Sequence, residues 1–268
     1  MTQGPSQQAS AAAVAVVIVN YATPELTMRA VASLIKERNS LPDLKVVVVD
    51  GGSPDHSANL LGSELSAAHY VSWVTFLPLA INGGFGWANN QAILRIARES
   101  KPPEFIYLLN PDASVTENAV VRLVEELRAY PRCGAVGSQL LSTEGIATAS
   151  AFRFPSVSRE LVGSAQSEQL ARLLRIPPGV ISSENSLEVD WVTGASVMFR
   201  AAALQDSGLF DDGFFLYFDE VELIHRIRSK GWTVRHVPES RVVHGRWERT
   251  PCRQGHPRRS FANVSTAP

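Results

Sequence analysis

Residues 44–50, LKVVVVD, decide the fold class that this sequence predicts. A continuous run of β-branched residues that ends at a polar residue is typical of a strand covered on both faces. Comparable runs occupy residues 14–20 (VAVVIVN), 71–77 and 105–109 (FIYLL). Segments with helical periodicity follow them, beginning at Pro24, passing through residues 60–65, and covering residues 86–98 and 116–130. This alternation predicts a single-domain α/β fold, a mainly parallel sheet flanked by helices on both faces.

The second half of the chain has a less regular pattern. We expect short strands at residues 135–139 and 146–152, an apolar segment at 189–199, a helix over 217–229, and two strands at 232–237 and 241–243. Residues 155–186 hold a short helical pattern between turn-rich stretches. This segment is a lid, an acceptor-side loop or a variable surface insertion, and its length does not separate these alternatives.

Composition limits the classes of protein to which the chain can belong. Its 268 residues are 45% hydrophobic, enough for one large domain with a buried core. The 25 basic and 26 acidic residues leave a net charge of −1, which gives no support to a nucleic-acid binder. Cys133 and Cys252 lack a metal-ligand spacing. The apolar run at 11–19 is about half as long as a membrane-spanning helix, so a cytoplasmic location is the default expectation.

Polar side chains stand where three of the predicted strands end. Asn20-Tyr21, Asp50 and Asn110-Pro111-Asp112 each follow a buried strand. Ligands of open α/β sheets bind beyond the carboxyl ends of the strands. Each residue taken singly is also a common helix cap or turn former, but three such ends together favour a site. The carboxylate of Asp112 could hold a hard divalent cation whose other ligands are phosphate oxygens and water.

A glycine-rich loop, NGGFGWANN at residues 82–90, joins the third predicted strand to its helix. Glycines allow close backbone approach, and a helix N-terminus attracts an anion. The loop is neither a Walker loop nor a dinucleotide fingerprint, because GK[ST] and GxGxxG are both missing. A glycine turn that only packs the helix on the sheet explains it equally well.

An acidic cluster begins the helix expected over 217–229. Asp219, Glu220 and Glu222 follow a run of aromatic residues. Acidic residues are common in a first helical turn, but aromatic neighbours raise the pKa of a carboxylate and suit it to general-base catalysis. His244 follows the last predicted strand. A lone histidine is more often structural, but this one would complete a metal or phosphate site if it folded over Asp112.

Together these segments resemble family 2 glycosyltransferases with a GT-A fold, in the rhamnosyltransferase-like branch. The resemblance covers about residues 14–247 and rests on six motifs in order, which are YATPE, VDGGSPD, NGGFGWANN, LNPD, WVTGA and FFLYFDEVEL. It implies an inverting transfer from a dTDP- or UDP-linked sugar, with rhamnose as one candidate. The acceptor would be a polysaccharide, a polyprenyl-linked glycan or a small-molecule natural product.

The resemblance also implies roles for individual residues. Glu220 matches the catalytic base, with Asp219 beside it, and Asp112 and His244 match the residues that hold Mg²⁺ or Mn²⁺. The nucleotide-binding positions are Asn20, Tyr21, Asp50, Asn82, Gly83, Gly84, Phe85, Gly86, Asn90 and Asn110. The positions beside the acceptor and the donor sugar are Trp191, Thr193, Gly194 and Ala195.

Two positions depart from the family pattern. Gly51 replaces the usual asparagine of VVDNGS, and the usual glutamate–aspartate pair is reversed as Asp219-Glu220. The reversal leaves the base open between the two carboxylates, and position favours Glu220.

The expected domain occupies residues 13–247, between a disordered tail at 1–12 and a basic, flexible tail at 248–268. The arginine-rich stretch at 241–260 either touches an anionic membrane surface or is a solvated tail. A homodimer is left open. The competing functions are a nucleotidyltransferase, which the absence of a phosphate loop after the first strand disfavours, and a non-catalytic sugar-nucleotide-binding protein.

Overall fold

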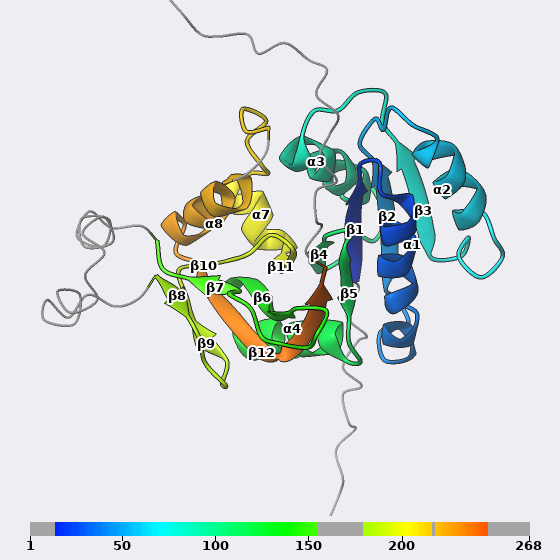
Figure 1. Cartoon of the computed structure of the whole chain (residues 1–268). Helices are drawn as coiled ribbons and strands as arrows, with labels where there is room; N and C mark the ends of the chain where they lie inside the picture. Colours follow the sequence, from blue (N-terminus) through cyan, green and yellow to red (C-terminus); the bar gives the residue numbers. More distant parts are fainter. Residues whose placement is uncertain (1–13, 155–178, 216–217, 246–268) are drawn as a thin grey trace, which may run out of the picture.

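A computed structural model describes residues 14–154, 179–215 and 218–245. Its main sheet has the strand order β3 (Val74–Pro78), β2 (Lys45–Asp50), β1 (Val14–Asn20), β4 (Phe105–Leu109), β11 (Ser196–Arg200), β6 (Cys133–Leu141), β12 (Thr233–His244) and β5 (Ala113–Val115), with β9 (Leu187–Glu188) paired to β12. A small second sheet has the order β10-β7-β8, formed by Trp191–Val192, Ala151–Phe152 and Val180–Ile181. Helices cover both faces of the main sheet (Figure 1). The α/β fold class predicted from the sequence is confirmed.

The N-terminal half of the sheet is parallel. Strands β1 (Val14–Asn20), β2 (Lys45–Asp50), β3 (Val74–Pro78) and β4 (Phe105–Leu109) all run in the same direction. Alternate residues of β1 enter two separate hydrophobic clusters. One cluster lies under α1 (Pro24–Ser33) and α2 (Ser57–Leu65), and the other lies under α3 (Phe85–Ile96). The valine run of β2 is therefore buried on both faces, which is the reason for its unbroken apolar sequence.

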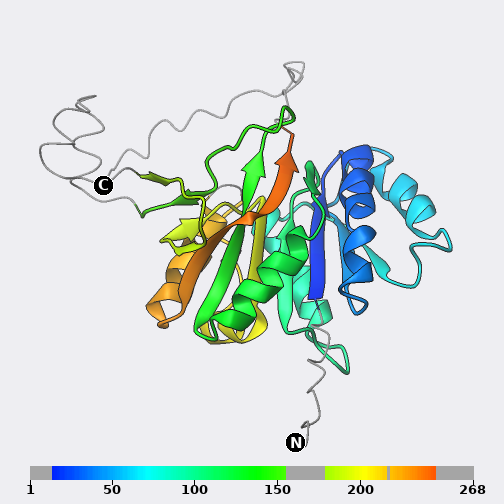
Figure 2. The same ribbon diagram turned by 90° about the horizontal axis from the view of Figure 1, so that it is seen from below.

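The second half of the sheet brings distant parts of the chain to the end of β4. Strand β11 (Ser196–Arg200) runs antiparallel between β4 and β6 (Cys133–Leu141), and β12 (Thr233–His244) runs parallel to β6. The last residues of β12 pair with β5 (Ala113–Val115), immediately after Asp112. Helices α4 (Ala119–Ala129), α7 (Ala201–Ser207) and α8 (Asp219–Ser229) complete the layers, which Figure 2 shows from below.

Some predicted bounds were wrong. The third strand begins at Val74, because residues 71–73 form a turn, and α4 begins at Ala119. Of the strand expected at 146–152, Ala151–Phe152 is a strand and Ala147 forms only an isolated bridge with Leu141. The two strands expected at 232–237 and 241–243 are one strand, β12, with an irregularity between Val237 and Arg241. At such an irregularity polar residues can lie within one continuous strand. In the sequence these residues look like a break between two strands.

The predicted tails at 1–12 and 248–268, and the greater part of the 155–186 segment, lie outside the described residues. Within the described ranges, no helix has the length and apolar character needed to cross a membrane.

A buried histidine makes the stability of the fold depend on pH. His236 of β12 is 1% exposed, and neither ring nitrogen has a hydrogen-bond partner among the described residues. Burial lowers the pKa of His236 to about 4, although the carboxylate of Glu239 opposes part of this shift. The unfolded chain therefore binds a proton here between about pH 6.5 and pH 4 that the folded chain does not bind.

We predict that the free energy of unfolding falls as the pH is lowered through this window. Substitution of His236→Leu should remove up to about 3 kcal/mol of that fall between pH 7 and pH 4. Denaturant unfolding at a series of pH values measures it. The exposed His56 provides the control, because His56→Leu should leave the dependence unchanged. An unaltered pH dependence in His236→Leu would contradict the prediction.

Candidate active site

A pocket of about 410 Å³ opens at the carboxyl ends of β1, β2 and β4. Six residues predicted from the sequence line it, namely Tyr21, Asn82, Gly84, Phe85, Asn110 and Asp112. Another hollow, of about 480 Å³, lies beside Leu94 and Arg98 near the other end of α3 and contains none of the predicted site residues. Part of the predicted strand-end site, Tyr21 and Asn110 to Asp112, therefore lines one pocket.

The sheet brings Asp112 and His244 together. His244 ends β12 opposite Ala113, and the backbone N–H of Gly245 donates to the carbonyl of Asp112 at 3.0 Å. As a result, Oδ1 of Asp112 lies 3.1 Å from Nε2 of His244, and both side chains stay partly exposed. The predicted approach of His244 to Asp112 is present in the structure.

Asp112 and His244 together suit a divalent cation whose coordination shell is completed by a bound phosphate-containing ligand. A carboxylate oxygen and an imidazole nitrogen are both common metal ligands. Among the described residues, no group of three or more His, Cys, Asp and Glu side chains could hold a metal ion. The chain itself would thus contribute Asp112 and His244, and phosphate oxygens and water would fill the other positions.

Asn20 and Asp50 lie beneath the pocket rather than in its wall. Asn20 is fully buried, and its Nδ2 donates to Oδ1 of Asp50 at 2.7 Å. The backbone N–H and the hydroxyl of Ser53 donate to the same carboxylate at 3.0 and 2.7 Å. The hydroxyl of Thr27 donates to Oδ1 of Asn20 at 2.9 Å. This network ties the ends of β1 and β2 together, so both residues support the pocket.

The glycine loop contacts Phe215, which was not among the site residues predicted from the sequence. Gly84 has a φ of +94°, and a Cβ placed on it would lie 2.4 Å from the carbonyl oxygen of Phe215. The N–H of Phe85 donates to that same carbonyl at 3.3 Å. Phe215 is 60% exposed and lines the pocket. The only available signal was its place in the aromatic run before the acidic cluster.

Three other residues of the loop serve packing. A Cβ on Gly83 would clash with the ring of Trp87, and one on Gly86 would clash with Phe210. Asn90, 6% exposed, bonds the backbone of Phe210. The structure therefore gives Gly83, Gly86 and Asn90 contacts within the protein, which fits the packing alternative at these three positions.

The two candidate bases differ in burial. Asp219 is 2% exposed, and its Oδ2 has no hydrogen-bond partner among the described residues. Glu220 is half-buried against Gly194, where an added Cβ would lie 3.3 Å from its side chain. Burial raises the pKa of Glu220, and the neighbouring Asp219 carboxylate raises it further. A carboxylate with a raised pKa suits a general base, so the environment of Glu220 matches that role.

The segment at 191–195 connects α8, which carries the two candidate bases, to the pocket. The carbonyl of Ala195 accepts a hydrogen bond from the N–H of Asn110 at 2.9 Å, while Gly194 contacts Glu220. The N–H of Thr193 donates to the carbonyl of Ser150, and Trp191 stacks on the ring of Phe152. Glu220 and the end of β4 are thus connected through one short segment.

Comparison with known proteins decides the family. The family model described as "Glycosyl transferase family 2" matches residues 15–166. The chain belongs to glycosyltransferase family 2. It is 27% identical over 212 residues to the N-acetylglucosaminyl-diphospho-decaprenol L-rhamnosyltransferase of Mycobacterium tuberculosis, covering 75% of this chain and 66% of that relative. It is 25% identical over 167 residues to rhamnosyltransferase WbbL of Escherichia coli K12, covering 60% of each.

A solved structure supports the fold independently. GalNAc-T7, determined with UDP, GalNAc and Mn²⁺, superposes with a TM-score of 0.65 at 17% identity, covering 89% of this chain and 44% of that one. At this identity the likeness shows the GT-A-like fold alone. The chain spans about two thirds of the length of the mycobacterial relative.

We predict that Asp112→Asn weakens metal-dependent nucleotide binding, because the substitution removes the charge that would attract the cation. Wild-type protein should gain several degrees of melting temperature from dTDP or UDP with Mn²⁺, and Asp112→Asn should lose most of that gain. A thermal-shift titration measures both. The exposed Asp43 supplies the control Asp43→Asn, which should respond like wild type. A full Mn²⁺-dependent shift in Asp112→Asn would contradict the assignment.

Proposed function

We propose that the chain transfers a sugar from a nucleotide-diphosphate donor to an acceptor hydroxyl with inversion at the anomeric carbon. The observation that supports this proposal is that the candidate metal ligands and the candidate base lie at the same edge of the sheet. Asp112 lines the pocket, His244 lies 3.1 Å from Asp112, and Glu220 is joined to the same edge of the sheet through Gly194 and Ala195.

The pocket suits the nucleotide part of such a donor. Tyr21, Phe85 and Phe215 supply aromatic surface in its wall, against which a base or ribose can pack. Gly51 also lines it, so this wall is bare backbone where the family usually carries an asparagine side chain. When bound by Asp112 and His244, Mg²⁺ or Mn²⁺ supplies Lewis-acid stabilisation of the charge on the departing diphosphate.

Glu220 would act on the acceptor. It takes the proton of the acceptor hydroxyl while that oxygen forms a bond to the anomeric carbon. The bond from that carbon to the diphosphate oxygen breaks, and its electron pair leaves with the diphosphate. General-base assistance of this kind contributes about 10²–10⁴ in rate.

The sugar and acceptor are proposed from the relatives. Both curated relatives described above are named rhamnosyltransferases, which favours a rhamnosyl donor such as dTDP-rhamnose. The name of the mycobacterial protein specifies a decaprenyl-diphosphate-linked N-acetylglucosamine acceptor. We accordingly propose a polyprenyl-linked acceptor at the cytoplasmic membrane surface, with the arginine-rich stretch at 241–260 as the peripheral contact.

We predict that Glu220→Gln slows transfer strongly and leaves donor binding intact. Glutamine preserves the size and packing of the side chain but cannot accept the proton, so the rate should fall about 10²–10⁴-fold. The measurement is release of dTDP from dTDP-rhamnose in the presence of an N-acetylglucosaminyl-diphosphate lipid, together with the dissociation constant of dTDP with Mn²⁺.

The matched variant is Asp219→Asn, which alters the neighbouring carboxylate. Near-normal turnover in Glu220→Gln with loss in Asp219→Asn would transfer the base to Asp219. Binding of dTDP without any turnover in wild type, across a panel of sugar nucleotides, would instead support a non-catalytic binding protein.

A further inference from the structure

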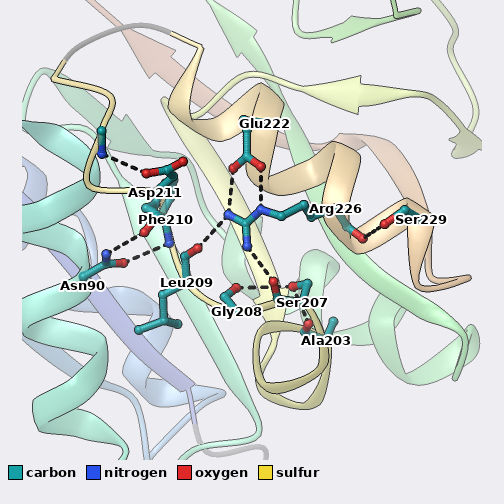
Figure 3. Close-up of polar contacts among 11 residues, drawn as sticks. Asn90, Ala203, Ser207, Gly208, Leu209, Phe210, Asp211, Glu222, Arg226 and Ser229 are labelled. Atoms are coloured by element: carbon teal, nitrogen blue, oxygen red, sulfur yellow. Dashed lines mark hydrogen bonds and ion pairs between the residues drawn. The ribbon is translucent and has the colours of Figure 1, made fainter.

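Arg226 of α8 forms an ion pair with Glu222 on the same helix. It also donates hydrogen bonds to a different segment of the chain. Nε and Nη2 of Arg226 donate to the two carboxylate oxygens of Glu222 at 2.5 and 2.7 Å. The same guanidinium donates through Nη1 to the carbonyl of Ser207 at 2.5 Å and through Nη2 to the carbonyl of Leu209 at 2.7 Å (Figure 3). One side chain thus fastens the end of α7 and the residues after it to α8.

Helix α3 holds the next residues of this segment from the opposite side. Nδ2 of Asn90 donates to the carbonyl of Phe210 at 2.9 Å and to Oδ1 of Asp212 at 2.9 Å. Oδ1 of Asn90 accepts from the N–H of Phe210 at 3.0 Å. Figure 3 shows Asn90 and Arg226 on either side of Leu209 and Phe210. Residues 207–212, which we call the bridging segment, are therefore fixed between the two helices.

The bridging segment leads directly to the wall of the pocket. Phe215 follows it, lines the pocket, and accepts a hydrogen bond through its carbonyl from the N–H of Phe85. Gly84 approaches the same carbonyl closely because it has no side chain. Displacement of the bridging segment would carry Phe215 away from this contact.

We propose that Arg226 is a positioning residue of the donor site, which holds the bridging segment so that Phe215 closes one wall of the pocket. Asn90 shares this role from α3. Arg226 lies on the helix that begins with Asp219 and Glu220. Its guanidinium therefore fixes the position of the pocket wall relative to the helix that carries the proposed base. This inference rests on the proposed function, since it takes the pocket to be the donor site.

The chemistry of arginine explains the choice of residue. A planar guanidinium offers five N–H donors, enough to bind a carboxylate in bidentate fashion and two carbonyls as well. A lysine at the same position keeps the charge and the attraction to Glu222, but one ammonium group cannot serve all four oxygens. Arg226→Lys therefore keeps the positive charge while removing part of the hydrogen bonding to the bridging segment, so it tests the hydrogen bonds apart from the charge.

The experiment measures binding of dTDP and UDP with Mn²⁺ by calorimetry, together with melting temperatures. We expect Arg226→Lys and Asn90→Ala each to weaken nucleotide binding about tenfold. The double variant should be little weaker than either single variant, because both side chains hold the same segment and their effects are then not additive.

Two controls separate positioning from general stability. Arg235 and Glu126, 2.6 Å apart, form an ion pair that is more buried than the pair of Arg226 and Glu222 and does not line the pocket, so Arg235→Lys should lower the melting temperature without changing the affinity. The exchanged pair E222R/R226E restores opposite charges on α8 but cannot donate to the carbonyls of Ser207 and Leu209. It should remain as weak in nucleotide binding as Arg226→Lys.

The outcomes distinguish this inference from the proposed function. If wild type binds neither nucleotide with Mn²⁺, the proposed function fails and the inference fails with it. If wild type binds and Arg226→Lys binds equally well, only the inference is overturned. Full recovery of affinity in E222R/R226E would also overturn it, because the ion pair on α8 would then suffice.

Discussion

The pairing of β12 with β5 is the constraint on which the site depends. It sets His244 opposite Ala113 and so brings an imidazole within 3.1 Å of Asp112, a residue from the other half of the chain. Strand β11, inserted antiparallel beside β4, brings the carbonyl of Ala195 to the N–H of Asn110 and Gly194 to Glu220. The order of the strands thus brings together the loops that line the pocket.

Helix α8 organises the second half of this arrangement. Its first turn carries the candidate base, and Arg226 reaches forward to the bridging segment. Arg228 on the same helix donates to the carbonyl of Val189 at 2.8 Å, shortly before the segment at 191–195. The bridging segment and the residue just before the 191–195 segment are therefore both bound to the helix that carries the candidate base, which allows their relative positions to be set together.

The sequence predicted the parts that depend on local pattern. The strands at 14–20 and 105–109 have the predicted bounds, because a strand buried on both faces must be apolar throughout. The approach of His244 to Asp112 was also anticipated. The supporting role of Asn20 was not, because a polar residue at a strand end looks the same whether it faces a ligand or a neighbour. Phe215 and Arg226 could not be assigned from sequence, since their partners lie in other elements.

The most direct test of the central claim is a calorimetric titration of the wild-type chain with dTDP and UDP, with Mn²⁺ and with a chelator. We expect binding of a nucleoside diphosphate that depends on the metal, because Asp112 and His244 alone cannot complete a cation site without phosphate oxygens. Equal affinity in the chelator, or no binding of either nucleotide with Mn²⁺, would contradict it.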